Sequence, residues 1–140
     1  MKLTGYEHQV QYYETDQMGC VHHSNYIRWF EEARTAYLDR LDMGYARMER
    51  EGIMSPVLQV QAEYKSMTRY GEKVSIEMEI VKYNGIRLTL AYRIKDFATG
   101  QLRCTGTSSH CFLDREGRIV SLKKEKPQWD KKLRTQMEEM

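Results

Sequence analysis

Apolar residues between positions 26 and 41 recur at the spacing of one buried helical face. They are Tyr26, Ile27, Phe30, Ala33, Tyr37, Leu38 and Leu41. Steps of three and four residues place such positions on the same side of an α-helix. Ser24 and Asn25 come directly before, where a side-chain oxygen can accept from the free amides of the first turn. The pattern predicts a long amphipathic helix that begins near Ser24 or Asn25.

The pattern on either side of this helix has a period of two, which is typical of strands. Strands are expected at 6–15, 57–64, 74–80, 86–94 and 103–113, with a short segment at 118–122. Turns are expected at Asn84-Gly85 and Thr99-Gly100. Gly44 is expected to end the main helix as its C-cap, and 45–51 to form further helical turns. The chain is predicted to be α+β, an antiparallel meander whose apolar face is covered by the helix.

Length and charge limit the classes of function. At 140 residues the chain is expected to be one domain, with a core at about 7–122, a short leader at 1–5 and a charged, frayed or peripheral helix in the tail at 123–140. A net charge of +2 gives no sign of a nucleic-acid surface. Three cysteines without C-x-x-C spacing, no signal peptide and no long apolar run predict a reduced, cytoplasmic protein that is not in a membrane.

The loop that leads into the helix carries the candidate chemistry. Asp16 lies there, and the first turn of a helix exposes N–H groups with partial positive charge. A carboxylate and a set of amide donors can therefore face the same small volume. This is a minimal arrangement for attacking a carbonyl and holding the oxyanion that results.

A longer motif around Asp16 carries a family resemblance. The run Tyr13-x-Thr15-Asp16-x-x-Gly19-x-Val21-x-His23-x-x-Tyr26, followed by Phe30-Glu31-x-Ala33-Arg34, resembles the signature of hotdog-fold acyl-CoA thioesterases of the 4-hydroxybenzoyl-CoA thioesterase and YbgC-like group. Tyr64-Lys65 and Tyr70-Gly71-Glu72 also fit, and the resemblance covers roughly 7–122. It implies an antiparallel sheet wrapped around a long central helix, in dimers or tetramers with sites at the subunit interface.

The resemblance also implies roles for particular residues. Asp16 matches the essential carboxylate, which acts as nucleophile or as general base on water, and His23 matches the residue whose backbone N–H polarises the thioester carbonyl. Gly19, Val21 and Tyr26 are candidate substrate-binding residues. The implied reaction releases a free acid and CoA, and needs no metal or organic cofactor. The sequence departs from the family with Glu14 in place of the usual first Asp, and with Cys20 and His22.

Other interpretations stay open at this point. The same fold can host hydration or dehydration of a 3-hydroxyacyl thioester, or bind an acyl thioester without turnover. The carrier can be CoA or an acyl carrier protein, and the acyl type and the choice between dimer and tetramer are undecided. Glu31 and Arg34, three apart on a helix, are expected at most to form an ion pair. A metal cluster is rejected because the histidine and cysteine positions, His8, Cys20, His22 and His23, match no zinc pattern.

Overall fold

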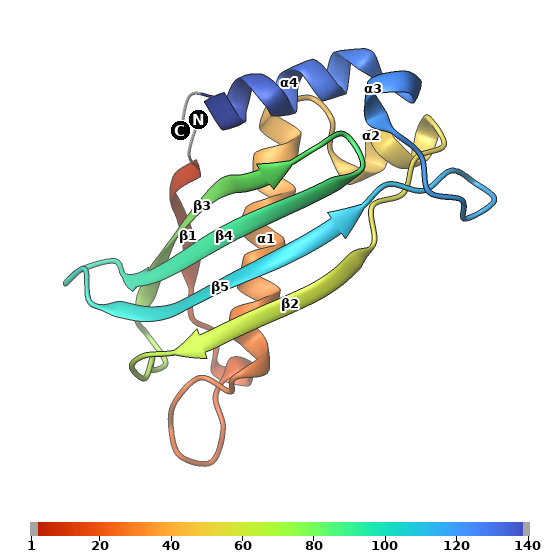
Figure 1. The fold of residues 1–140 in the computed structure, drawn as a ribbon. Coiled ribbons are helices and arrows are strands. Elements are labelled where there is room, and N and C mark those ends of the chain that lie inside the picture. The colour runs from red at the N-terminus through yellow and green to blue at the C-terminus, as the bar shows by residue number, and fades with distance from the viewer. Residues whose placement is uncertain (1–2, 139–140) are drawn as a thin grey trace.

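A five-stranded antiparallel sheet curves around one long helix in the computed structural model, which describes residues 3–138 (Figure 1). The elements in chain order are β1 (Leu3–Gln9), a 3-10 turn η1 (Tyr12–Glu14), α1 (Ser24–Arg40), α2 (Tyr45–Arg50), β2 (Val57–Tyr64), β3 (Lys73–Tyr83), β4 (Arg87–Asp96), β5 (Leu102–Cys111), α3 (Leu122–Glu125) and α4 (Pro127–Glu138). The fold class predicted from the sequence is confirmed.

The sheet has the strand order β1-β3-β4-β5-β2. Strands β3, β4 and β5 form the expected meander, and the β3–β4 hairpin turns at Gly85, whose φ of 93° favours glycine. The order differs from a simple meander at one edge, because β2 pairs with β5. Strands β3 and β4 alternate buried and half-exposed residues, as expected for a sheet with one covered face. Strand β2 differs, since nearly all of its residues are exposed.

The face of α1 that is buried differs in part from the face that the apolar spacing predicted. Ile27 is 37% exposed, whereas Trp29 and Arg34, which the pattern leaves outside the apolar set, are buried. The helix ends at Arg40, before the expected C-cap. Asp42 takes the left-handed position with a φ of 57°. Gly44 instead precedes α2, at a place where a Cβ would meet the Asp39 carboxylate, so close packing explains this glycine.

The first and last parts of the chain also differ from expectation. The strand expected at 6–15 lies at Leu3–Gln9, and Tyr12 and Tyr13 are exposed in the 3-10 turn. The expected leader therefore contributes residues 3–5 to β1, and its residues 1–2 lie outside the described part. The segment at 118–122 forms only an isolated bridge at Ile119 before α3 begins.

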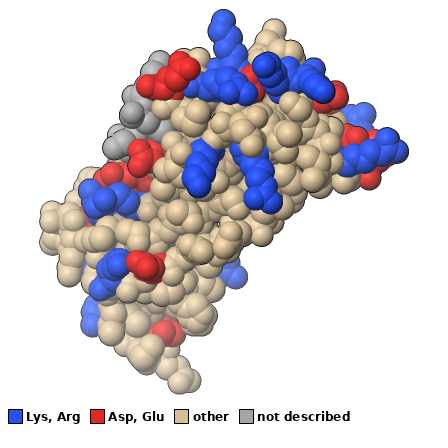
Figure 2. All heavy atoms as spheres, viewed as in Figure 1, with Lys and Arg blue, Asp and Glu red and all other residues tan. Residues whose placement is uncertain are grey.

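Helix α4 lies across one end of the sheet and contributes Trp129 and Leu133 to the hydrophobic core (Figure 1). The tail helix is thus more deeply packed than a frayed one. Lys and Arg side chains gather over α3 and α4 at the top of the view, while the opposite end is mostly uncharged (Figure 2). Among residues 3–138, no helix is long and apolar enough to cross a membrane.

Candidate active site

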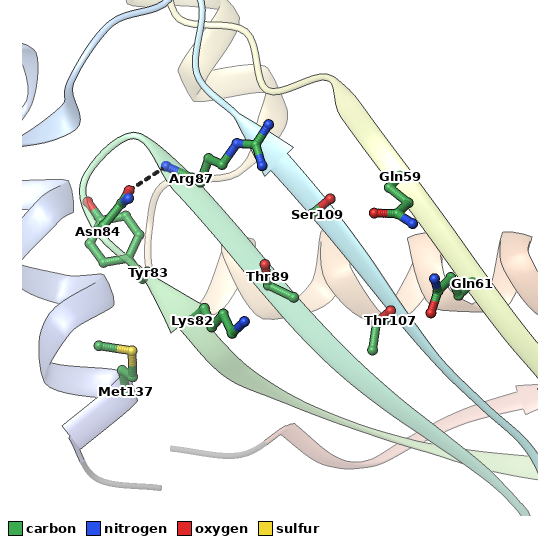
Figure 3. A pocket seen from close by; sticks show the side chains of 10 residues that line it. All are labelled: Gln59, Gln61, Lys82, Tyr83, Asn84, Arg87, Thr89, Thr107, Ser109 and Met137. Atoms are coloured by element: carbon green, nitrogen blue, oxygen red, sulfur yellow. Dashed lines mark hydrogen bonds between the residues drawn. The ribbon is translucent and has the colours of Figure 1, made fainter.

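A polar hollow of about 620 Å³ lies on the face of the sheet that points away from α1 (Figure 3). Its lining comes from β2 to β5 with the turn after β3 and from Met137, and includes Gln59, Gln61, Thr107 and Lys82. None of the lining residues is a carboxylate, a histidine or a cysteine. The residues with candidate chemistry gather elsewhere, at the start of α1.

The loop between η1 and α1 projects beyond the body of the chain, at the bottom of the ribbon in Figure 1. Its stem is an isolated antiparallel bridge between Thr15 and Val21. The Asp16 amide donates to the Cys20 carbonyl at 2.9 Å, and Gly19 turns the chain with a φ of 79°. Asp16 directly follows one bridged residue and His23 comes two residues after the other, so both leave the same stem close to the bridge.

The Asp16 carboxylate is half-buried and faces its own turn. Its Oδ1 accepts the Met18 amide at 2.8 Å, and the Cys20 thiol lies 3.7 and 3.9 Å from Oδ1 and Oδ2. These contacts leave lone pairs of both oxygens free, since an ionised carboxylate offers about four acceptor positions. The carboxylate is held in place without being neutralised by a cation, because no described Lys or Arg forms an ion pair with it.

The N-terminus of α1 is not capped in the way that the sequence predicted. His23 occupies the N-cap position and no side chain caps the helix in the expected way. The Ser24 amide donates to His22 Nδ1 at 3.2 Å. The Asn25 amide donates to the His22 carbonyl, and the Tyr26 amide to the His23 carbonyl. Of these first amides, the His23 N–H is the one that donates to no described residue. The predicted set of free donors is thus reduced to the amide of His23.

Three ring side chains lie at the entry of α1. The His23 ring is exposed, with its centroid 4.2 Å from that of His22 and 6.1 Å from that of Tyr64. The Tyr64 hydroxyl donates to the His23 carbonyl at 3.3 Å. His8 does not join these rings, because its two ring nitrogens lie against Glu14 and Glu32.

The candidate substrate-binding residues lie at different depths. Gly19 is exposed at the tip of the loop, and Val21 and Tyr26 are buried in the core. The Tyr26 hydroxyl donates to the Thr68 hydroxyl at 3.1 Å, and the Val21 amide donates to the Thr68 carbonyl at 2.8 Å. Thr68 therefore fastens the loop to the segment after β2, a contact that no local sequence signal indicates.

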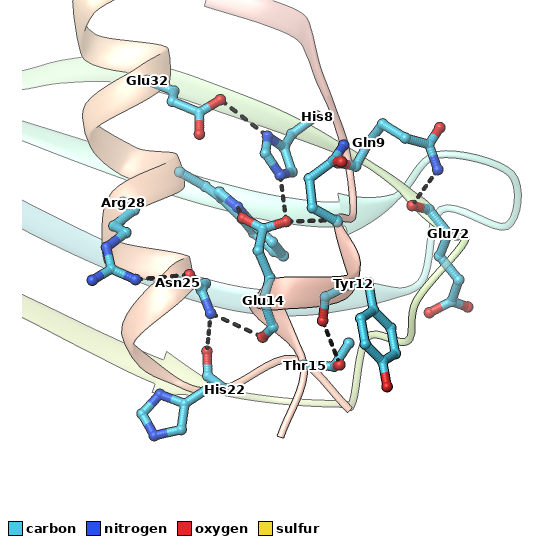
Figure 4. Close-up of polar contacts among 12 residues, drawn as sticks. His8, Gln9, Tyr12, Glu14, Thr15, His22, Asn25, Arg28, Glu32 and Glu72 are labelled. Carbon is cyan, nitrogen blue, oxygen red and sulfur yellow. Dashed lines mark hydrogen bonds and ion pairs between the residues drawn. The ribbon is translucent and has the colours of Figure 1, made fainter. Parts of the chain in front are cut away.

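Glu14 makes further contacts that the motif does not explain. Figure 4 shows its side chain between His8 and the start of α1, and its backbone carbonyl near Asn25. Burial raises the pKa of Glu14, but hydrogen bonds from His8, Gln11 and Trp29 outweigh this and hold the pKa below its ordinary value. A buried, ionised carboxylate thus lies two residues before Asp16.

The ion pair considered for Glu31 and Arg34 is not formed between the described residues of this chain. Arg34 is buried and donates to the hydroxyls of Tyr45 at 2.6 Å and Tyr92 at 3.0 Å. Glu31 is exposed and forms no ion pair with Arg34. The buried position of Arg34 on α1 excludes a surface pair.

A family model described as the thioesterase-like superfamily matches residues 10–137 of the chain. The chain belongs to this superfamily. A Bacillus subtilis (strain 168) protein provisionally named acyl-CoA thioesterase YneP is 38% identical over 130 residues, which cover 92% of this chain and 94% of the relative. An Aquifex aeolicus (strain VF5) protein provisionally named an esterase is 34% identical over 122 residues, covering 86% and 91%.

Solved structures place this thioesterase-like chain in the hotdog fold. The structure of a DHNA-CoA thioesterase from Staphylococcus aureus has a TM-score of 0.90 and 32% identity, covering 96% of this chain and 89% of that one. The S. aureus protein SAV2348, solved in complex with CoA, has a TM-score of 0.88 at 15% identity, covering 99% and 86%, and supports the fold alone. The fold that the resemblance implied is confirmed.

Proposed function

We propose that the protein hydrolyses acyl-CoA thioesters, with Asp16 and the backbone amide of His23 as the catalytic groups. The observation that carries this proposal is the amide at the N-terminus of α1 that has no described acceptor, beside the loop stem that holds a carboxylate. Helix N-termini favour negative charge, so an oxyanion is a suitable acceptor there. The relatives named as thioesterases support the same reaction.

The proposed reaction replaces the thioester C–S bond by a C–O bond. Asp16 either attacks the carbonyl carbon, giving a mixed anhydride that water then cleaves, or takes a proton from the attacking water. In both routes the CoA thiolate leaves and takes up a proton, and the acyl group becomes a carboxylic acid. The His23 amide donates to the oxygen on which charge develops, an effect worth about 3–4 kcal/mol for one such donor.

We propose that Val21, Tyr26 and Gly19 contact the acyl side of the substrate. The Tyr26 ring lies edge-on to Tyr64, with centroids 5.4 Å apart, and this pair reaches from the core to the exposed His23. An aromatic acyl group would fit beside such rings. The DHNA-CoA thioesterase among the similar structures is a reason to test an aromatic acyl-CoA first.

We also propose that the protein is a homo-oligomer, with at least a dimer formed along the free edge of β2. This strand exposes Val57, Leu58, Val60 and Tyr64 by 37–48% each. An exposed apolar edge strand is a template for pairing with another strand. Light scattering should give at least twice the chain mass of 16.7 kDa, and Val60→Lys should shift it toward the monomer. A monomeric wild type would contradict this proposal.

The test of the reaction compares wild type with Asp16→Asn on a panel of short aliphatic, long aliphatic and aromatic acyl-CoAs. The asparagine oxygen can still accept the Met18 amide, so the turn should keep its shape. We expect wild type to release thiol from at least one class, and the variant to lose about 1,000-fold or more in kcat, as for other enzymes without their nucleophile or base.

A matched control separates chemistry from turn structure. Asp114 also holds a tight turn, by accepting the amides of Glu116 and Arg118 at 2.9 Å each. Asp114→Asn should keep the wild-type kcat. Equal turnover by wild type and Asp16→Asn would remove Asp16 from its role, and no thiol release from any acyl-CoA would refute CoA thioesters as substrates. An acyl carrier protein thioester would then be the next substrate to assay.

A further inference from the structure

Glu14 carries a fully enclosed carboxylate at the base of the site loop. The residue is only 3% exposed to solvent, and its carboxylate is satisfied instead by three N–H groups. Oε1 lies 2.8 Å from His8 Nε2 and 2.8 Å from the Gln11 amide, and Oε2 accepts the Trp29 indole N–H at 2.8 Å. The side chain therefore ties together β1, the 3-10 turn and the middle of the first half of α1.

The backbone carbonyl of Glu14 faces the other way, into the loop stem. It accepts the His22 amide at 2.8 Å and the Asn25 side-chain amide at 2.9 Å. The same Asn25 nitrogen lies 3.3 Å from the His22 carbonyl (Figure 4). One residue thus fixes the chain two positions before Asp16 and one position before His23.

An outer layer holds His8 against Glu14. Figure 4 shows the imidazole between two carboxylates, with Nδ1 3.0 Å from Glu32 Oε1 on α1 and Nε2 on Glu14. The Tyr6 hydroxyl donates to the same Glu32 oxygen at 3.1 Å. With the imidazole clamped on both sides, the donor to Glu14 has one orientation, and the inner carboxylate is held rigidly.

We infer that Glu14 is a positioning residue, whose charged carboxylate sets the geometry between Asp16 and the His23 amide for the proposed thioester hydrolysis. The inference rests on that proposed function for its kinetic part. Glu14 touches no reacting atom. It acts by holding both strands of the loop stem, and displacements of about 1 Å in such a loop can slow catalysis by about 100-fold.

The charge matters because all three partners of the carboxylate are donors. An amide in its place offers one oxygen and an NH₂ group, and in either orientation the NH₂ group would face the N–H of Gln11 or of Trp29. One contact would then be lost or become repulsive within an enclosed site. Glu14→Gln keeps the size of the side chain and changes this property alone, while Glu14→Asp keeps the charge.

The kinetic experiment measures kcat and KM for Glu14→Gln and Glu14→Asp beside a matched control, Asp130→Asn. Asp130 is also a buried carboxylate, which accepts the Tyr83 hydroxyl at 2.6 Å and Arg134 Nε at 2.9 Å, but it lies on α4. We expect Glu14→Gln to lower kcat by about 10- to 100-fold with KM within about threefold, and Glu14→Asp to recover most of the loss. Asp130→Asn should keep the wild-type kcat.

Hydrogen exchange gives a second measurement that needs no turnover. The His22 amide is bonded to the Glu14 carbonyl and the Asp16 amide to the Cys20 carbonyl. In Glu14→Gln both should exchange about tenfold faster or more, while amides of the β4–β5 pair change no more than in Asp130→Asn. If wild type hydrolyses no thioester, the proposed function fails, and this exchange still decides whether Glu14 holds the loop.

Three results would overturn the inference. The first is a Glu14→Gln protein that melts earlier, as Asp130→Asn does, but keeps its kcat and its loop protection. The second is a loss of kcat without faster exchange at His22 and Asp16. The third is Glu14→Asp being as slow as Glu14→Gln, which would exclude the carboxylate charge as the cause.

Discussion

Helix α1 carries two buried polar clusters, and they have opposite charges at their centres. Near its start, the Glu14 carboxylate receives three N–H donors. Half a helix further on, the Arg34 guanidinium donates to the phenols of Tyr45 and Tyr92. The first cluster is joined through backbone bonds to the loop that carries Asp16. The second joins the helix to α2 and β4, at a distance from that loop.

The second cluster continues into the sheet through neutral groups. The Tyr92 hydroxyl lies 2.6 Å from the Ser108 hydroxyl, which lies 2.8 Å from His110 Nε2. Within the described residues no carboxylate forms an ion pair with Arg34. Buried polar groups on one helix can therefore serve different purposes. We infer that the Glu14 cluster positions the site loop, whereas the Arg34 cluster holds α1 against α2 and β4.

The largest effect expected from this comparison is on stability, from Arg34→Met. The variant leaves two buried phenols without their donor, so the free energy of unfolding should fall by about 3 kcal/mol. The kcat of the folded protein should stay within about threefold of wild type. Chemical denaturation together with thiol release checks both. A loss of kcat as large as that of Glu14→Gln, at temperatures where the variant is folded, would remove the distinction between the clusters.

A pH-dependent effect of similar size is expected from His110. Burial, and next the charge of Arg34, lower its pKa from 6.5 to about 4. Between these values the unfolded chain binds a proton that the native chain does not, so stability is present above pH 6.5 and falls as the pH drops toward 4. At about 1.4 kcal/mol per pH unit, the loss reaches about 3 kcal/mol.

The check on His110 is the difference in unfolding free energy between wild type and His110→Gln at pH 7, 6, 5 and 4. Glutamine does not titrate, so the variant should lose less stability than wild type over this range, whatever its stability at pH 7. Parallel curves for the two proteins would show that His110 does not stay neutral in the fold. The Arg34 cluster would then be able to accept a second charge.

The periodic elements could be predicted from the sequence because their signal is local. Strands β3 and β4 and helix α1 follow from spacing, and Asn84-Gly85 marks its hairpin. The strand expected at 6–15 was misplaced because Tyr12 and Tyr13 are typical strand residues, yet they lie exposed in a 3-10 turn. Spacing also could not show that β2 pairs with β5, since strand order depends on contacts far along the chain.

The candidate site was predictable as a motif and less so as a geometry. The sequence placed Asp16 and His23 at the helix entry, but it predicted capping by Ser24 or Asn25, whereas Asn25 bonds to the Glu14 carbonyl. For Arg34 the sequence suggested at most a pair with Glu31, three residues away, whereas its partner Tyr92 is 58 residues away. A side chain's partner in a core depends on how distant elements meet, and a single sequence carries no direct signal of that.

The most direct test of the central claim is a single-turnover experiment on Asp16→Asn with the acyl-CoA that wild type hydrolyses best. With enzyme in excess, all of the substrate should bind to the variant with a Kd within a few-fold of wild type, and it should remain intact when wild type has converted it completely. Such a result assigns Asp16 to the chemical step. Conversion of the bound thioester by Asp16→Asn at the wild-type rate would contradict the account.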